Sequence, residues 1–350
     1  MELKNLQKHI RTLATLEETD SPVISFYLTL EASASEHRRV LKERALWVRQ
    51  TLSGKARQEF EEALGRIEAF IATELLPDAK GAVLFARGGP QPFFLPLQFR
   101  VPLPNWVAVN STPNLYHLVE LKDTYHRYVV VISTEESARI LEVNLGAVTE
   151  ELWRQRPELR QRVGRGWSKE HYQNHRRERT NQFIKETIKA LEQLMTAGGH
   201  THLILAGDPQ MTARVRQALP KHLAARLIDT VVAANSDEIS DVVAATIASF
   251  VEEEEQESLA IVDALQREVK PGGLAAIGPE ASLEAMKRGQ ADVLVLAKGM
   301  FDVRLKEELV RLAEQNQCQV EVVNHSDFLM EFGGVGCLLR YLTPEQYANK

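Results

Sequence analysis

The segments RYVVVIST (127–134) and SARILEVNLG (137–146) are apolar, rich in β-branched residues and separated by only two residues. They predict the two strands of a β-hairpin. Downstream, HLILAG (202–207) and LIDTVVA (227–233) predict two further strands. Helical patterns separate these segments, and an alternation of strand and helix is typical of a layered α/β domain.

Two helices of this block carry apolar stripes with the 3.6-residue period of a helix packed on a sheet. The first helix spans about 168–195, and its stripe is Phe183, Ile184, Thr187, Ile188, Leu191 and Leu194. The second is a long helix that follows a capping box of Asn235 and Glu238. Its stripe is Ile239, Val242, Val243, Thr246, Ile247 and Phe250. Between them, DPQMTARVRQAL (208–219) predicts a helix that Asp208 and Pro209 open.

Outward from this block, the pattern predicts three domains. Residues 1–122 form an N-terminal α/β domain, with an apolar strand at 21–30, two helices and three short strands. Residues 123–265 form the middle domain, and residues 266–350 form a C-terminal α/β sandwich. In its last segment, EFGGVGCLLRY (331–341), the glycines predict a tight turn between a helix and a strand.

The composition is that of a soluble globular protein, with 44% hydrophobic and 26% charged residues in a chain of 350. No apolar run is long enough to span a membrane, and the N-terminus is too polar for a signal peptide. We therefore expect a cytoplasmic protein. Cys318 and Cys337 lack metal-ligand spacing and predict buried free thiols.

One segment has a net charge opposite in sign to that of the whole chain. The formal net charge is −6, yet residues 153–182 contain nine Arg and Lys against three Glu, a local balance of +6. The remainder therefore sums to −12. This asymmetry favours an anionic partner that is contacted at one place.

Several segments resemble one family in sequence and in order. They are the hairpin, the Gly-Arg-Gly turn at 164–166, RRERTNQFIKETIKAL (176–191), LILAGDPQ (203–210), IGPEASLEAMKRGQADVLVLAKG (277–299) and EFGGVGCLLRY. Over about residues 123–350 the chain resembles the archaeo-eukaryotic class-one release factors and their relatives Pelota and Balon, in a divergent bacterial group. The resemblance implies an RNase H-like middle domain and a C-terminal α-β-α sandwich like the kink-turn-binding ribosomal proteins.

In the family, the corresponding loop carries Gly-Gly-Gln and helps water to hydrolyse peptidyl-tRNA on the ribosome. Here the loop reads VGRGWS (163–168). Gly164, Arg165 and Gly166 match the family, but Trp167 replaces a glycine, and the glutamine position is either lost or occupied by Ser168. The resemblance makes Gly164, Gly166 and Ser168 the candidate catalytic loop, and its changed sequence disfavours hydrolysis. The Asn-Ile-Lys-Ser motif for stop codons does not occur in the chain.

The predicted RNA-binding residues lie in and just after this loop, because arginines pair with phosphates and aromatic rings stack on unpaired bases. They are Arg162, Gly164, Arg165, Gly166, Trp167, Lys169, Arg176, Arg177 and Arg179. Each prediction has an alternative that stays open. For Trp167 it is packing against its own domain, and for the arginines it is a solvated face with Glu178 and Glu186. His171 and His175 share a helix face but lack a third ligand, so no metal and no cofactor are predicted.

These residues favour a ribosome-associated protein that binds the A site, touching rRNA and tRNA, in ribosome rescue or hibernation. The alternative is a peptidyl-tRNA hydrolase with altered loop chemistry. A small-molecule hydrolase lacks support, since the chain has no GxSxG, P-loop or GxGxxG context. The resemblance also implies that the C-terminal domain meets a translational GTPase.

Overall fold

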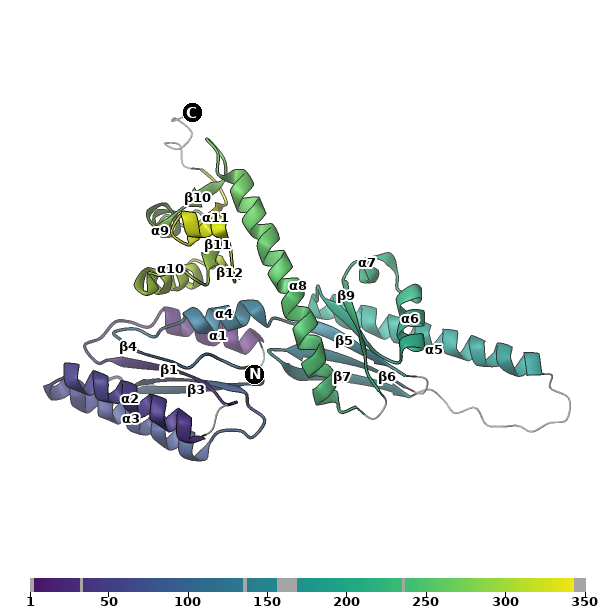
Figure 1. The fold of residues 1–350 in the computed structure, drawn as a ribbon, viewed down its shortest axis with the longest axis horizontal. Helices are drawn as coiled ribbons and strands as arrows, with labels where there is room; N and C mark the ends of the chain where they lie inside the picture. Colours follow the sequence, from purple (N-terminus) through teal and green to yellow (C-terminus); the bar gives the residue numbers. More distant parts are fainter. Residues whose placement is uncertain (1–2, 32–33, 135–136, 156–168, 235–236, 343–350) are drawn as a thin grey trace. The chain divides into compact units, whose positions relative to one another are not determined.

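The computed structural model describes residues 3–31, 34–134, 137–155, 169–234 and 237–342 (Figure 1). Their contacts divide the chain into two compact units. Unit 1 comprises residues 1–126 and 254–350, and unit 2 comprises residues 127–253. The middle of the chain thus folds on itself, whereas the first and last parts fold together. Within the described ranges, no helix is long and apolar enough to cross a membrane.

The sheet of unit 2 has the strand order β7-β6-β5-β8-β9. Its strands are β5 (Tyr128–Ser133), β6 (Ser137–Asn144), β7 (Ala147–Gln155), β8 (Leu203–Gly207) and β9 (Leu227–Val232). The β5–β6–β7 pairs are antiparallel, while β8 runs parallel to β5 and β9 parallel to β8. This order and direction are those of an RNase H-like sheet. The predicted hairpin and the predicted fold of this segment are confirmed.

Helices cover both faces of this sheet, because β5 is apolar on both sides. The helices are α5 (Lys169–Gly198), α6 (Pro209–Ala218), α7 (Lys221–Ala224) and the first part of α8 (Ile239–Glu268). Val129 and Val131 of β5 pack with α5 and α6, whereas Val130 and Ile132 pack with α8. Both predicted stripes are confirmed. Asp208 caps α6 by accepting from the backbone N–H of Gln210 and Met211, whereas Asn235 lies outside the described residues.

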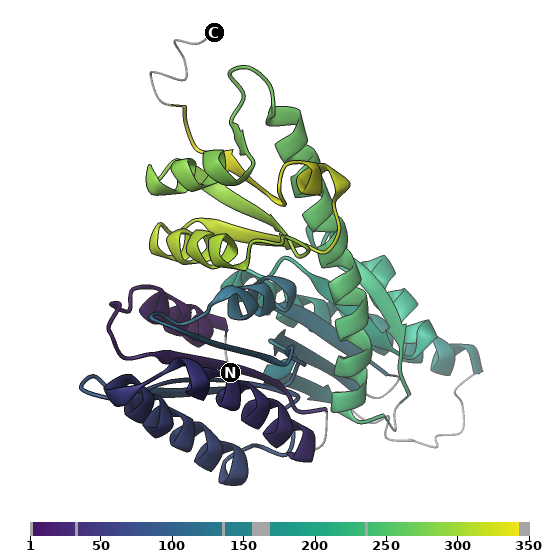
Figure 2. The same cartoon turned by 60° about the vertical axis from the view of Figure 1, so that its left-hand side comes forward.

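The N-terminal part of unit 1 is an antiparallel sheet of order β3-β2-β1-β4. Its strands are β1 (Val23–Thr29), β2 (Gly81–Arg87), β3 (Phe93–Phe99) and β4 (Trp106–Asn110). The predicted pair α2 (Ala34–Thr51) and α3 (Gly54–Thr73) covers one face. Two helices that were not predicted, α1 (Leu3–Ala14) and α4 (Tyr116–Thr124), lie on the other face (Figure 2).

The C-terminal part of unit 1 is a three-layer α-β-α sandwich, as expected. Its sheet has the order β10-β13-β11-β12, with strands β10 (Ala275–Ile277), β11 (Ala291–Ala297), β12 (Gln319–Val323) and β13 (Val335–Leu339). One face packs against the end of α8 and α11 (Asp327–Glu331). The other face carries α9 (Pro279–Lys287) and α10 (Val303–Gln315), as Figure 2 shows. The predicted domain limits at 122/123 and 265/266 stay predictions.

Two details of this sandwich agree with the sequence. Gly333 and Gly334 have φ of 84° and 82°, a conformation that favours glycine, and they turn the chain from α11 into β13. Cys318 and Cys337 are buried free thiols. Burial raises the pKa of each thiol to about 12, so neither is a reactive thiolate at neutral pH.

Candidate nucleic-acid interface

The basic stretch of the sequence connects β7 to α5 in unit 2. Arg162, Gly164, Arg165, Gly166, Trp167 and Ser168 lie outside the described residues. The described part of the candidate interface therefore consists of its two flanks, the end of β7 and the first turns of α5.

The β7 flank belongs to an outer strand of the sheet. β7 pairs with β6 through a register that places Trp153 opposite Arg139 and Gln155 opposite Ser137. Leu145 and Gly146 close the hairpin with φ of 50° and 74°, and positive φ at both central residues is the geometry of a type I′ turn. The chain consequently enters the basic stretch from the edge of a sheet whose register is fixed.

Along the α5 flank the side chains change from exposed to buried. Arg177, Glu178 and Arg179 are exposed, whereas Thr180 and Phe183 are buried and open the apolar stripe. The preceding residues, from Lys169 to Arg176, form the first turns of α5 but provide no apolar period. Figure 1 shows these turns extending beyond the sheet of their own unit. The helix is therefore anchored by its later turns and presents its first turns outward.

The two described arginines of this flank offer positive charge in different directions. Arg177 and Arg179 are two residues apart, which separates them by about 200° around an α-helix. In the described part of the chain neither makes an ion pair, and Glu186 accepts a hydrogen bond from Gln182 Nε2 at 2.9 Å instead. The N-terminal end of a helix adds partial positive charge. This flank can therefore meet an anionic surface with charges that the protein's described carboxylates do not neutralise.

The remaining predicted residues of α5 are placed only by their backbone. Lys169 and Arg176 lie in the helix, as do His171 and His175, and the positions of these four side chains are outside the described part. The predicted RNA contacts and the expected absence of a metal at the histidines stay predictions.

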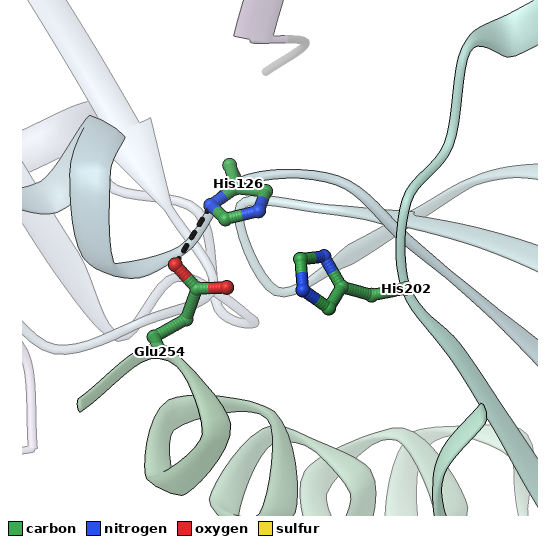
Figure 3. Close-up of side chains that lie close together, drawn as sticks. All are labelled: His126, His202 and Glu254. Carbon is green, nitrogen blue, oxygen red and sulfur yellow. Dashed lines mark ion pairs between the residues drawn. The ribbon is translucent and has the colours of Figure 1, made fainter. Parts of the chain in front are cut away.

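Unit 1 contains a polar pocket of about 420 Å³ that the sequence did not indicate. It gathers Asp123 of α4, His126 of the loop after α4, Glu254 of α8 and Glu321 of β12. His126 Nδ1 lies 3.2 Å from Glu254 Oε2, the ion pair drawn in Figure 3. Burial opposes the charged imidazole, but the hydrogen bond and charge of Glu254 outweigh it, so the pKa of His126 is raised.

Two carboxyl groups of this pocket hold protons more tightly than usual. Burial and then the charge of Glu321 raise the pKa of Asp123 well above its ordinary value. Burial also raises the pKa of Glu321, which accepts a hydrogen bond from Ser258 Oγ at 2.5 Å. These carboxyls come from helix and strand segments that are about 200 residues apart, so no local motif could have indicated them. They make the stability of unit 1 dependent on pH.

Unit 2 has an RNase H-like sheet, and the C-terminal part of unit 1 is an α-β-α sandwich, the two folds that the resemblance implies. Residues 113–250 match the model of the bacterial archaeo-eukaryotic release factor family 10. Over these residues the match agrees with the resemblance that the sequence indicates. It contains the whole basic stretch and all strands of unit 2.

Solved structures of release-factor-like proteins are also similar in part. The archaeal translation termination factor aRF1 is 17% identical, with 97% of this chain and 99% of that chain covered and a TM-score of 0.31. Archaeoglobus fulgidus Pelota is 14% identical, with coverages of 98% and 93% and a TM-score of 0.42. Archaeal Pelota in a model bound to the ribosome with ABCE1 is 15% identical, with coverages of 97% and 94% and a TM-score of 0.47. None of these three TM-scores reaches 0.5, so the partners of these proteins are facts about them alone. The sequence has no match among curated proteins.

Proposed function

We propose that this protein binds the ribosomal A site through the basic segment between β7 and α5 and acts in ribosome rescue or hibernation. The observation that carries the proposal is the position of this segment. It lies inside the release-factor family match, and it continues into helix turns whose Arg177 and Arg179 are exposed. An acidic protein with one such segment would meet rRNA at that place.

Phosphate contacts explain the composition of the segment. Arginine pairs with phosphate oxygens, which supplies affinity and orientation but little sequence information. Arg162, Arg165, Lys169, Arg176, Arg177 and Arg179 are the proposed phosphate ligands. Gly164 and Gly166 would let the backbone approach RNA closely, and Trp167 would stack on an unpaired base of rRNA or tRNA.

Binding without peptide release is the favoured outcome. The loop has Trp167 and Ser168 where the family has glycine and glutamine, so the group that positions the hydrolytic water is missing. Stop-codon reading is not proposed, since the codon motif does not occur in the sequence. A translational GTPase partner is a further proposal from the resemblance, and residues 266–350 are the proposed place of contact.

The binding part of the proposal is tested by co-sedimentation of the full chain with purified ribosomes. The variant Arg177→Glu/Arg179→Glu reverses two exposed charges of the α5 flank. Its control, Arg214→Glu/Arg216→Glu, makes the same change at two exposed positions of α6 in the same unit. We expect the first variant to lose affinity by about tenfold or more, and the control to lose much less, because electrostatic contact with RNA is local.

Two further measurements complete this experiment: the salt dependence of ribosome binding and the release of labelled peptide. Between about 50 mM and about 200 mM salt, binding of the wild type should fall steeply, and the α5 variant should show a log–log slope shallower by about 2 for two lost phosphate contacts. Stalled complexes with labelled peptide should stay intact. Release that disappears in Gly164→Ala/Gly166→Ala would establish the hydrolase instead. Equal losses in both charge variants, or no ribosome binding at low salt, would refute the proposal.

A further inference from the structure

A second cavity of unit 1 has the features of a ligand site, and it is independent of the basic segment. It has a volume of about 250 Å³ and lies where β4 and α4 meet the connection from β11 to α10. The residues that matter for its chemistry are Trp106, Asn114, Tyr116, Glu120, Lys298 and Lys306. All of them belong to unit 1.

Apart from Glu120, whose Oε1 pairs with Lys298, three of these residues carry buried polar atoms that have no hydrogen-bond partner among the described residues. They are Trp106 Nε1, Asn114 Oδ1 and Tyr116 Oη. Asn114 is only 3% exposed and Tyr116 only 6%. A buried polar group without a partner is destabilising, and native structures rarely leave several of them together. All three residues line the same cavity, so a ligand bound there is the candidate partner for these groups.

The backbone around these groups is held firmly. Tyr27 Oη donates to the Asn114 carbonyl at 2.6 Å, and the Asn114 N–H donates to Ser25 Oγ at 2.9 Å. In the next two residues, the N–H groups of Leu115 and Tyr116 donate to Glu307 at 2.7 and 2.9 Å. The main chain is thus satisfied while the side chains of Asn114 and Tyr116 are not. This is a preorganised wall with free side-chain groups.

The cavity is lined by aromatic rings and by both hydrogen-bond donors and acceptors. The ring of His117 packs edge-on against Trp106 and Tyr116, with centroid distances of 5.5 and 5.0 Å. The free indole N–H is a donor, the amide oxygen is an acceptor, and the phenol can be either. A complementary ligand is therefore a flat ring with both donors and acceptors on its edge.

Two lysines add positive charge. Lys306 is 6% exposed, donates from Nζ to the Lys298 carbonyl at 3.0 Å and lies 4.3 Å from the centre of the Tyr116 ring. The Lys298 side chain is 55% exposed at the rim, and its Nζ pairs with Glu120 Oε1 at 2.8 Å. An exposed ammonium at the rim can reach an anionic group attached to a ring in the cavity.

We infer that this cavity binds a nucleobase of a nucleotide, with the base among Trp106, Asn114 and Tyr116 and the phosphate at Lys298. Unpaired bases are recognised by aromatic rings and by hydrogen bonds to their edges. The volume is below the range of about 300–1,000 Å³ for drug-sized ligands, which suits a single base. The nucleotide is either free or an unpaired residue of an RNA strand, and both share this chemistry.

Calorimetric titration of the full chain with AMP, GMP, UMP and CMP tests the inference. We expect at least one of them to bind with a dissociation constant below about 1 mM. Tyr116→Phe and Trp106→Phe keep a ring and remove one hydrogen-bonding group, so each should weaken binding by about 3- to 10-fold. Trp47→Phe, at a side chain that is 75% exposed on α2, is the control and should change nothing.

A stability measurement separates lost binding from lost folding. Tyr116→Phe removes an unsatisfied buried hydroxyl, so without nucleotide its melting temperature should equal or exceed that of the wild type. Higher stability combined with weaker binding is the signature of a ligand group. A variant that melts lower and binds as well as the wild type would contradict the assignment.

Two further binding experiments test where the phosphate lies and whether the nucleotide is free or part of an RNA strand. The matching nucleoside should bind more weakly than the nucleotide, and Lys298→Gln should abolish this difference. Binding of a single-stranded hexanucleotide but of no mononucleotide, with the same sensitivity to Tyr116→Phe, would assign the site to RNA. The inference is overturned if none of these probes binds at about 1 mM, if inorganic phosphate competes as well as the nucleotide, or if both ring variants bind normally.

Discussion

At the scale of single residues, the clearest physical effects come from buried ionisable groups in unit 1. Asp123 accepts a hydrogen bond from the backbone N–H of Val322 at 2.8 Å, and Glu321, the preceding residue, is held by Ser258. Both carboxyls have raised pKa values, through burial first and, for Asp123, the charge of Glu321 next. The folded protein therefore binds protons here more tightly than the unfolded chain does.

This linkage predicts how the stability of unit 1 depends on pH. An acid whose pKa is raised on folding stabilises the protein below its unfolded pKa, and this stability is lost as pH rises through the folded pKa. Asp123→Asn keeps an acceptor for Val322 and removes the charge. Its free energy of unfolding should exceed that of the wild type at neutral pH, by an amount on the order of 1 kcal/mol, and the two should converge near pH ~4.

Thermal unfolding of the full chain across this pH range measures the effect. Asp263→Asn is the control, because Asp263 is an exposed carboxylate on α8 in the same unit. A parallel pH dependence in the wild type and Asp123→Asn would show that Asp123 ionises normally in the folded protein.

At the scale of elements, α5 is one helix whose later turns pack in the core of unit 2 and whose earlier turns expose arginines. Leu191 is fully buried in the cluster that joins α5 to β5 and β8, whereas Arg177 and Arg179 are exposed. Stability and the proposed binding are thus assigned to different turns. Changes at one end of α5 should not imitate changes at the other.

We expect Leu191→Ala to lower the stability of unit 2 by about 2–5 kcal/mol, because it removes core contacts and leaves a cavity. Arg177→Glu/Arg179→Glu should leave that stability within about 0.5 kcal/mol, as surface substitutions usually do. Hydrogen exchange of peptides from β5 and β8 in the full chain reports the opening of this unit. Lys189→Ala, at an exposed position of α5, is the control. Fast exchange in the charge variant would mean that its binding defect reflects unfolding.

The elements that sequence predicts well are those whose own residues determine their burial. β5 is buried on both faces, so it reads as a continuous apolar run, and α5 carries a clear 3.6-residue stripe. α1 and α4 were not predicted. The sequence of α1 does contain the pattern of an amphipathic helix, with Leu6, Ile10 and Leu13 buried at helical spacing. α4 has only nine residues, and its packing depends on α10 near the other end of the chain: the N–H of Tyr116 donates to Glu307 at 2.9 Å.

The cavity near Tyr116 escaped sequence reasoning for the same reason. Glu307 and Leu115 are 192 residues apart and join through a hydrogen bond, and no motif links them. The basic segment, in contrast, was visible as a local excess of arginine. Sequence therefore indicates sites made by one segment, and it misses sites that tertiary packing assembles.

At the scale of the whole molecule, the distribution of charge is the central property. The chain has a net charge of −6, while residues 153–182 carry +6. Like charges repel, so an acidic body disfavours general adhesion to RNA, and one basic segment selects how the protein approaches it. The proposed interface belongs to unit 2 and the proposed nucleotide cavity to unit 1, which lets variants test them separately.

Photo-crosslinking on the ribosome tests most directly whether the basic segment contacts ribosomal RNA. A photoreactive amino acid is placed at position 177 on α5 or, as the control, at position 214 on α6, and both positions are exposed. We predict crosslinks from position 177 to rRNA of the peptidyl-transferase centre, and few or none from position 214. Ribosome-bound protein whose position 177 crosslinks no rRNA, or no more than position 214 does, would contradict it.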